Sequence, residues 1–133
     1  MPAGVWPRLV LKEAGQPVDA ESGTRVISSA TAAKIRRMLE GVLAPGGTAS
    51  EVSVPGYKLA GKTGTSEKAV DGGYSTSRYV ASFVGFAPAA DPRLLVAIVV
   101  DEPHGDIYGG SVAAPAFGQI AKFALPYLGI PPS

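Results

Sequence analysis

The chain has 133 residues, which is enough for a single hydrophobic core but too short for two independent ones. Its 12 Lys and Arg nearly balance its 11 Asp and Glu, and the net charge of +1 supplies no broad field for nucleic acid or anionic lipid. Because the sequence contains no Cys, disulfides, thiolate chemistry and cysteine-based zinc sites are excluded.

The composition predicts a soluble, folded domain with many turns. Hydrophobic residues make up 46% of the chain, beside 17 Gly and 12 Pro. The longest apolar run, Leu94 to Val100, is far shorter than the roughly 20 residues that span a bilayer, and the first residues do not have the pattern of a signal peptide. We therefore expect no membrane-spanning segment in this sequence.

The N-terminal part of the chain is weakly specified. Arg8 to Leu11 predict a short strand, and Glu13 to Thr24 are rich in turn residues. From Ser28 onward the pattern becomes regular. We therefore expect residues 1–133 to form part of a single domain. It would have a weakly specified entry segment of about residues 1–27 and regular secondary structure over residues 28–133.

An amphipathic helix is predicted from about Thr31 to Leu43. Apolar residues recur at the spacing of one helical face, and basic residues form the solvated opposite face. The apolar set is Ile35, Met38, Leu39, Val42 and Leu43, and the basic set is Lys34, Arg36 and Arg37. Ser28, Ser29 and Thr31 are available as N-caps, and Pro45-Gly46-Gly47 ends the helix.

Three later segments have the composition of strands. They are Tyr57 to Thr65, Tyr79 to Phe86 and Leu94 to Val100, and the stretch from Ser66 to Ser77, with its Gly-Gly pair, predicts a mobile loop. Seven residues join the second segment to the third, too few for a parallel crossover, so the two must pair antiparallel. Neither segment alternates cleanly, which predicts that both faces of the sheet are covered.

A second helix is predicted near the C-terminus, where apolar residues recur at helical spacing. They are Val112, Ala116, Phe117, Ile120, Phe123, Ala124, Tyr127 and Leu128. This wide apolar surface is expected to pack on the sheet. The predicted fold class is therefore α+β, with helices packed against an antiparallel sheet.

Residues Gly56 to Thr63 match the phosphate-loop pattern G-x-x-x-x-G-K-[ST]. The apolar run ending at Asp101-Glu102 is also similar to the acidic strand end that holds magnesium in nucleotide-binding enzymes. A phosphate loop, however, requires a helix directly after its Lys-Thr pair. No apolar residues recur at helical spacing between Ser66 and Ser77, so a nucleotide-binding protein is kept as the minor alternative.

The same stretch contains Lys62-Thr63-Gly64, the K-T-G triplet of serine β-lactamases and penicillin-binding proteins. It belongs to a series of short motifs, which are Ala60 to Thr65, Ala81 to Pro88, Asp101 to Pro103, Tyr108 to Gly110 and Ala114 to Phe117. In this order the motifs resemble the C-terminal part of the transpeptidase domain of class B penicillin-binding proteins, most of all the division-specific peptidoglycan synthase type. The resemblance runs from about Val26 to Pro132.

The residues around the triplet suit the recognition of a peptide that carries a carboxylate. Gly64 has no side chain, so a ligand backbone can approach closely and pair with the strand. Lys62 supplies a positive charge, while Thr63 and Thr65 supply hydroxyl donors. The backbone N–H of Thr65 could also stabilise an oxyanion during acyl transfer.

The resemblance implies a serine-type D,D-transpeptidase that crosslinks peptidoglycan by acyl transfer from D-Ala-D-Ala stem peptides and that binds β-lactams. It implies catalytic roles for Lys62, in the nucleophile's proton transfers, and for Thr65, whose N–H is half of the oxyanion hole. The resemblance also implies substrate-binding roles: Lys62 holds the environment of the terminal carboxylate, Thr63 and Thr65 contact that carboxylate, and Gly64 completes the substrate-binding strand. It further implies a partial transpeptidase fold, no cofactor or metal, division proteins as partners, and a location on the outer or periplasmic face of the bacterial inner membrane.

Two motifs of that family do not occur in the sequence. No Ser is followed three positions later by Lys, and the chain has no Asn for an S-x-N motif. Thr31-Ala32-Ala33-Lys34 comes nearest to S-x-x-K, and we interpret Thr31 as a capping residue. We therefore expect a fragment that lacks the nucleophile and the N-terminal part of its domain, is inactive alone, and can self-associate through an unpaired sheet edge.

A further alternative is a non-enzymatic module that recognises penicillin or serves as a scaffold and keeps only this strand. His104, the only His, stands among acidic residues, but one His rarely forms a metal site or a catalytic base, so we expect an ordinary surface residue. The scattered aromatic residues lack the interleaved basic residues of a nucleic-acid surface, and no nucleic-acid partner is expected.

Overall fold

A computed structural model of the chain describes residues 12–13, 16–17 and 25–132. The chain divides into two compact units, one up to Ile35 and one from Arg36 onward. In the first unit, β1 (Lys12–Glu13) pairs antiparallel with β2 (Gln16–Pro17). The strand predicted from Arg8 to Leu11 lies outside the described residues.

Helix α1 runs over Ser29–Glu40 and begins and ends somewhat earlier than the sequence pattern predicts. Ser28 is its N-cap, because the Ser28 Oγ accepts the backbone N–H of Thr31 at 3.1 Å. Thr31 lies inside the first turn, with its hydroxyl 2.9 Å from that of Ser28. The interpretation of Thr31 as the capping residue is therefore wrong, since the cap must precede the first turn whose amides it satisfies.

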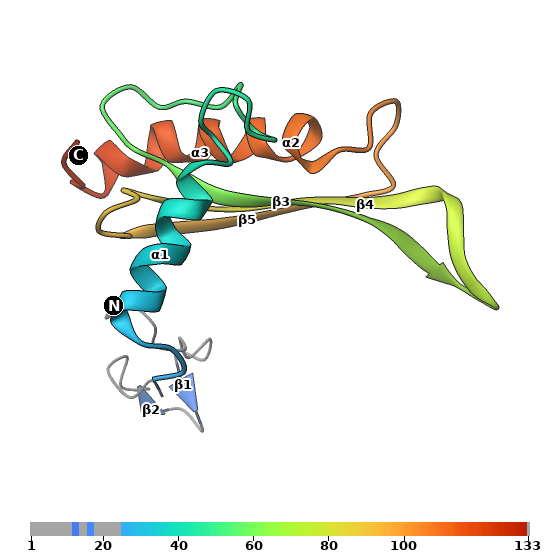
Figure 1. The fold of residues 1–133 in the computed structure, drawn as a ribbon, viewed down its shortest axis with the longest axis horizontal. Coiled ribbons are helices and arrows are strands. Elements are labelled where there is room, and N and C mark those ends of the chain that lie inside the picture. Colours follow the sequence, from blue (N-terminus) through green and yellow to red (C-terminus); the bar gives the residue numbers. More distant parts are fainter. Residues whose placement is uncertain (1–11, 14–15, 18–24, 133) are drawn as a thin grey trace. The chain divides into compact units, whose positions relative to one another are not determined.

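The second unit is built on a three-stranded antiparallel sheet in the order β3-β4-β5 (Figure 1). The strands are β3 (Ala60–Val70), β4 (Gly73–Ala87) and β5 (Leu94–Asp101). Gly64 lies opposite Ser82, and Ser82 lies opposite Val99. With helices beside it, this sheet confirms the α+β prediction, and β3 is an edge strand of the sheet that the structure describes.

The prediction of a mobile loop over Ser66 to Ser77 is wrong. This stretch forms the outer half of the long β3–β4 hairpin that extends beyond the helices in Figure 1. Asp71 and Gly72 join the strands, and Gly72 has a φ of 86°, a left-handed conformation that glycine adopts without steric cost. Both faces of this outer half are largely exposed. Its sequence therefore lacks the alternation of apolar and polar residues that identifies a half-buried strand.

An ion-pair cluster links the hairpin to the end of β5. The Lys68 Nζ lies 2.9 Å from an Asp101 oxygen and 2.7 Å from a Glu102 oxygen, and Arg78 lies 3.9 Å from Glu102. Hydrogen bonds to Glu102 and then Asp101 raise the pKa of Lys68. The acidic pair that is similar to a magnesium-binding strand end is thus engaged by basic side chains of the hairpin.

The predicted C-terminal helix corresponds to α3 (Ala114–Tyr127), and a short helix that the sequence pattern did not predict, α2 (Gly109–Val112), precedes it. Pro115 lies in the first turn of α3. N–H groups in the first turn have no acceptor within the helix, so the absence of an N–H on Pro115 costs no helical hydrogen bond. No helix among the described residues is long and apolar enough to cross a membrane.

Only a narrow stripe of α3 packs on the sheet. Its buried residues are Ala114, Phe117, Ala121 and Leu125. Phe123 and Tyr127 are 71% and 78% exposed and stack on each other with ring centroids 5.6 Å apart. The expectation that the whole apolar surface of this helix packs on the sheet is therefore wrong, because small Ala residues bring one face of the helix close to the strands.

The centre of the core is an aromatic pair above two glycines. The Phe83 and Phe117 ring centroids are 5.1 Å apart, and both side chains are fully buried. Gly61 of β3 lies opposite Gly85 of β4. A Cβ on Gly61 would overlap the Phe83 ring, and one on Gly85 would lie 2.7 Å from Phe117 ring carbons. The two glycines therefore allow the rings to lie directly on the backbone of β3 and β4.

Replacing Gly85 should test this packing. We expect Gly85→Ala to lower the free energy of unfolding by about 1–3 kcal/mol, because the added methyl group forces the aromatic rings apart. Urea denaturation followed by circular dichroism measures the change. Ala97→Ser, at an exposed position of β5, is the matched control and should change stability little. Equal stability of Gly85→Ala and the unsubstituted chain would contradict this account of the core.

The other face of the sheet is open. Along β5 half-buried and exposed residues alternate strictly, and Leu95 and Val99 are each 67% exposed. Val84 of β4, on the same face, is 42% exposed. The prediction that both faces are covered is wrong for the described part of the chain: apolar residues occupy both faces, but only one of these faces has a helix against it.

This open face and the edges of the sheet should make the isolated chain self-associate. In sedimentation velocity, we expect the average mass to rise with concentration, and the double substitution Leu95→Lys with Val99→Lys to reduce that rise. Thr76→Lys, on the exposed hairpin, adds a charge away from the patch and serves as the control. A stable monomer at every concentration would contradict the prediction.

Candidate functional site

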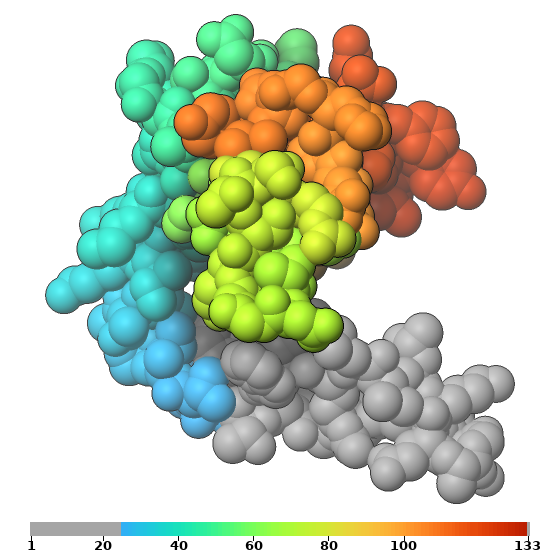
Figure 2. All heavy atoms as spheres, turned by 90° about the vertical axis from the view of Figure 1, so that its right-hand side faces the viewer, coloured from blue at the N-terminus to red at the C-terminus, as the bar shows by residue number. Residues whose placement is uncertain are grey.

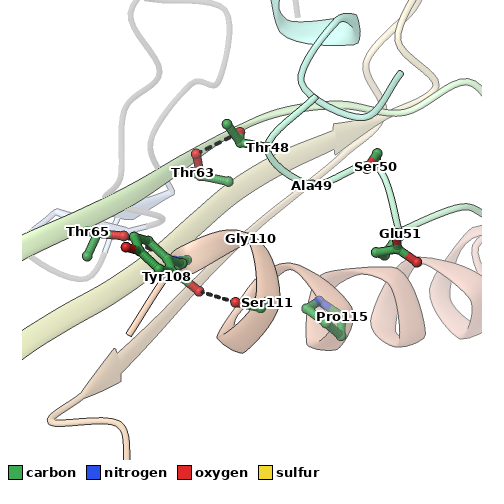
Figure 3. A pocket seen from close by; sticks show the side chains of 11 residues that line it. Thr48, Ala49, Ser50, Glu51, Thr63, Thr65, Tyr108, Gly110, Ser111 and Pro115 are labelled. Atoms are coloured by element: carbon green, nitrogen blue, oxygen red, sulfur yellow. Dashed lines mark hydrogen bonds between the residues drawn. The ribbon is translucent and has the colours of Figure 1, made fainter. Parts of the chain in front are cut away.

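A pocket of about 540 Å³ lies beside β3, between the segment that precedes this strand and the start of the C-terminal helical region (Figure 3). The lining residues are Thr48, Ala49, Ser50, Glu51, Thr63, Thr65, Tyr108, Gly109, Gly110, Ser111 and Pro115. Five of these eleven residues are Ser or Thr, and the only charged residue among them is Glu51. The pocket thus offers many hydroxyl groups, which suit a polar or anionic ligand.

The alternation of β3 distributes the four predicted site residues over two faces. Thr63 and Thr65 line the pocket, whereas Lys62 and Gly64 do not. Lys62 is exposed, and its ammonium donates a 2.8 Å hydrogen bond to the backbone carbonyl of Thr63. The structure therefore brings the two Thr hydroxyls together in the pocket and holds the Lys62 ammonium at the backbone of the same strand.

The start of α2 is seated directly on this strand. The Thr65 Oγ1 accepts the backbone N–H of Gly109 at 3.2 Å. A Cβ on Gly109 would overlap the Ser82 carbonyl oxygen and lie 2.5 Å from that of Gly64, so only glycine permits this approach. In Figure 2 the orange segment that leads into α2 accordingly lies against the yellow-green hairpin. Because Thr65 accepts this bond, its own O–H is available to another acceptor.

Thr48 provides the opposite contact to the strand. Its Oγ1 lies 3.0 Å from the Thr63 Oγ1, as the dashed line in Figure 3 marks. Its neighbour Ala49 is buried and donates its backbone N–H to the Val42 carbonyl at 2.9 Å. Sequence reasoning did not find Thr48, because nothing in the sequence relates it to a strand 15 residues further on.

The loop between β5 and α2 places Tyr108 at the pocket, with 66% of this residue exposed. The Asp106 Oδ1 accepts the backbone N–H of Tyr108 at 3.0 Å. Hydrogen bonding with Ser111, and then with the backbone N–H groups of Tyr108 and Ile107, lowers the pKa of Asp106. An ionised Asp106 therefore holds the backbone of the loop that carries Tyr108.

His104 is an exposed residue of the same loop, which confirms the expected surface placement. Within the part of the chain that the structure describes, no three His, Asp or Glu side chains come together as a metal site would need. Lys62 and Thr63 lie inside β3, which continues as an extended strand to Val70. The phosphate-loop alternative is therefore wrong, since the helix that it needs is replaced by a strand.

The pH dependence of the Tyr108 loop follows from Asp106. Because the pKa of Asp106 is lowered, the stabilisation of the loop is complete above the ordinary value of 3.8 and is lost as the pH falls through the lowered pKa. In an NMR titration from about pH 6 to about pH 2, we expect the Tyr108 amide signal to shift with a midpoint below that ordinary value.

Asp106→Asn provides the control for this titration, because an amide does not ionise in this range. In that variant the Tyr108 amide signal should stay in place over the same pH range. A midpoint above pH 3.8 for the Tyr108 signal of the unsubstituted chain would contradict the assigned direction.

The sequence matches the family model for the penicillin-binding protein transpeptidase domain over residues 5–122. The chain therefore belongs to the family of penicillin-binding protein transpeptidase domains. It is 44% identical over 116 residues to the probable peptidoglycan D,D-transpeptidase PenA of Neisseria gonorrhoeae. It is also 44% identical over 128 residues to stage V sporulation protein D of Bacillus subtilis and 35% identical over 130 residues to the peptidoglycan D,D-transpeptidase FtsI of Escherichia coli.

These alignments cover 86%, 96% and 97% of this chain and 20%, 20% and 22% of the three relatives. The chain thus spans about a fifth of the length of the curated relatives that it matches. Among solved structures, it is similar to the apo transpeptidase domain of penicillin-binding protein 3 from Burkholderia pseudomallei, with a TM-score of 0.75 and 44% identity over 92% of this chain and 36% of that one. The family resemblance and the fold expected from it are confirmed.

Proposed function

We propose that this chain forms one wall of the active site of a peptidoglycan D,D-transpeptidase, which takes an acyl group from a D-Ala-D-Ala stem peptide and is acylated by β-lactams. The observation that carries the proposal is the pair of hydroxyls of Thr63 and Thr65, which line one pocket from an edge strand. Membership in the transpeptidase family supports the class of reaction.

In this proposal the stem peptide binds as an additional strand along β3. An edge strand offers backbone N–H and C=O groups to an extended ligand. A Cβ on Gly64 would lie 2.5 Å from the Ser82 Oγ, so the space beside Gly64 is taken by β4, and the ligand pairs with the strand at its free edge. The ligand's terminal carboxylate then accepts hydrogen bonds from Thr63 and Thr65. During acyl transfer the backbone N–H of Thr65 serves as one donor of the oxyanion hole.

Lys62 acts in the proton transfers of the nucleophile in the proposed site. Its ammonium is exposed and lies at the Thr63 carbonyl, so a modest rotation of its flexible side chain can bring it to a nucleophile presented from outside this chain. The sequence has neither an S-x-x-K motif nor any Asn. We therefore propose that the nucleophile and the second wall of the cleft come from a preceding part of the same domain.

The open face of the sheet supports this fragment proposal. Leu95, Val99 and Val84 are all exposed on this one face, and a group of exposed apolar residues on one sheet face marks a surface that another part of a protein covers. The similar Burkholderia domain is much longer, since the alignment covers 36% of it. The rest of the domain would cover this face, and the complete protein would work at the outer face of the bacterial inner membrane with division proteins as partners.

Covalent labelling with a fluorescent penicillin tests the proposal. We expect the product of the complete open reading frame to be labelled and the isolated 133-residue chain to remain unlabelled, because the chain lacks the nucleophile. Labelling of the isolated chain would contradict the fragment proposal. If the complete product bound penicillin only reversibly, a non-enzymatic recognition module would replace the transpeptidase.

Substitution of Lys62 tests its proposed role. In the complete protein, Lys62→Ala should lower the rate of acylation by at least about a hundred-fold, the usual effect of removing a group that transfers protons. Lys122→Ala, at an exposed position of α3, is the matched control. Thermal unfolding should be the same in both variants. Unchanged penicillin reactivity of Lys62→Ala would show that the assigned role is wrong.

A further inference from the structure

We infer that Thr48 is a positioning residue, whose hydroxyl orients that of Thr63 toward the carboxylate of the substrate. The inference deepens the proposed function of β3 and rests on it. Thr48 lies outside the strand and outside the triplet, yet its Oγ1 is 3.0 Å from that of Thr63, and both residues line the same pocket (Figure 3).

The direction of this hydrogen bond follows from counting protons. A hydroxyl group carries one proton, so it can donate once and must otherwise accept. Thr65 accepts the Gly109 N–H and therefore keeps its proton for the ligand. Thr63 can act in the same way only if the proton in its bond with Thr48 comes from Thr48. With a carboxylate bound, Thr48 donates to Thr63, and Thr63 donates to the carboxylate.

The spacing of the two strand hydroxyls fits one carboxylate. Thr63 and Thr65 are separated by two positions on one face of β3, which corresponds to about 7 Å along an extended strand. Two hydrogen bonds of about 2.8 Å can bridge this separation when a carboxylate lies between the hydroxyls. Each hydroxyl then donates to the carboxylate, and each has one further polar contact, Thr65 with the Gly109 N–H and Thr63 with the Thr48 hydroxyl.

The backbone around Thr48 is held in place beside the strand. A Cβ on Gly110 would overlap the Thr48 carbonyl oxygen, which shows how closely α2 packs on this segment. Gly47, just before Thr48, donates its N–H to the Ala44 carbonyl at 2.8 Å, and Ala49, just after it, is buried in the core. The Thr48 side chain itself is exposed in the pocket, where a hydroxyl contributes little to the core.

Two substitutions separate the hydroxyl from the shape of the side chain. Thr48→Val keeps the shape and removes the hydroxyl, whereas Thr48→Ser keeps the hydroxyl. The complete protein would be acylated with benzylpenicillin and with its methyl ester, and the kinetics would be resolved into a dissociation constant and an acylation rate. We expect Thr48→Val to weaken binding of benzylpenicillin by about two- to twelve-fold, as the loss of one neutral hydrogen bond predicts.

The ester and the Ser variant distinguish positioning from a structural role. Thr48→Ser should restore the binding of benzylpenicillin, and Thr48→Val should bind the ester as well as the unsubstituted protein does, because the ester has no carboxylate. In a Thr63→Val background, Thr48→Val should have no further effect. Thermal unfolding of each variant shows that the domain is folded.

The possible results separate the two claims. If the unsubstituted protein were not acylated, the proposed function and this inference would both be overturned. If it were acylated but Thr48→Val bound benzylpenicillin normally, only the role of Thr48 would be overturned. The same conclusion would follow if Thr48→Val weakened the binding of penicillin and ester equally.

Discussion

The contact on which the structure depends is the packing of the Phe83 and Phe117 rings above Gly61 and Gly85. The glycines remove the side chains that would separate the rings from the sheet, so α3 can lie close to β3 and β4. Close-packed interiors tolerate few other arrangements of such large side chains. The same contact determines where the chain enters α3, and therefore where the short α2 helix before it must lie.

The pocket is a consequence of this placement. Once α3 is fixed above the sheet, α2 begins over Gly64 and Ser82, and Gly109 and Gly110 allow it to touch the backbone on both sides. Thr65 is then reached by an amide of α2, while Thr63 is reached by Thr48 from the segment before β3. The Lys62-Thr63-Gly64 triplet thus belongs to only one strand of the site. The other walls come from segments far away in the sequence.

Those long-range contacts also explain how far the sequence could be interpreted. Local patterns were sufficient for the antiparallel pairing of β4 with β5, because the six residues that connect these strands are too few for a parallel crossover. Periodicity failed over Ser66 to Ser77, where both faces of the hairpin are exposed and polarity carries no information about strand or loop. It also could not identify Thr48, since a hydrogen bond between two pocket hydroxyls has no signature in the spacing of residues.

The alternation of β3 gives the proposed site a further property. Thr63 and Thr65 face the pocket, and Lys62 belongs to the other face, so carboxylate recognition and proton transfer start from opposite faces of one strand. A slip of one residue would exchange these faces and bring the ammonium into the pocket. The aromatic rings prevent this slip. They lie over the paired residues Gly61 and Gly85, and a slipped register would place a residue with a side chain beneath them. The aromatic core thus determines which side chains of the strand reach the ligand.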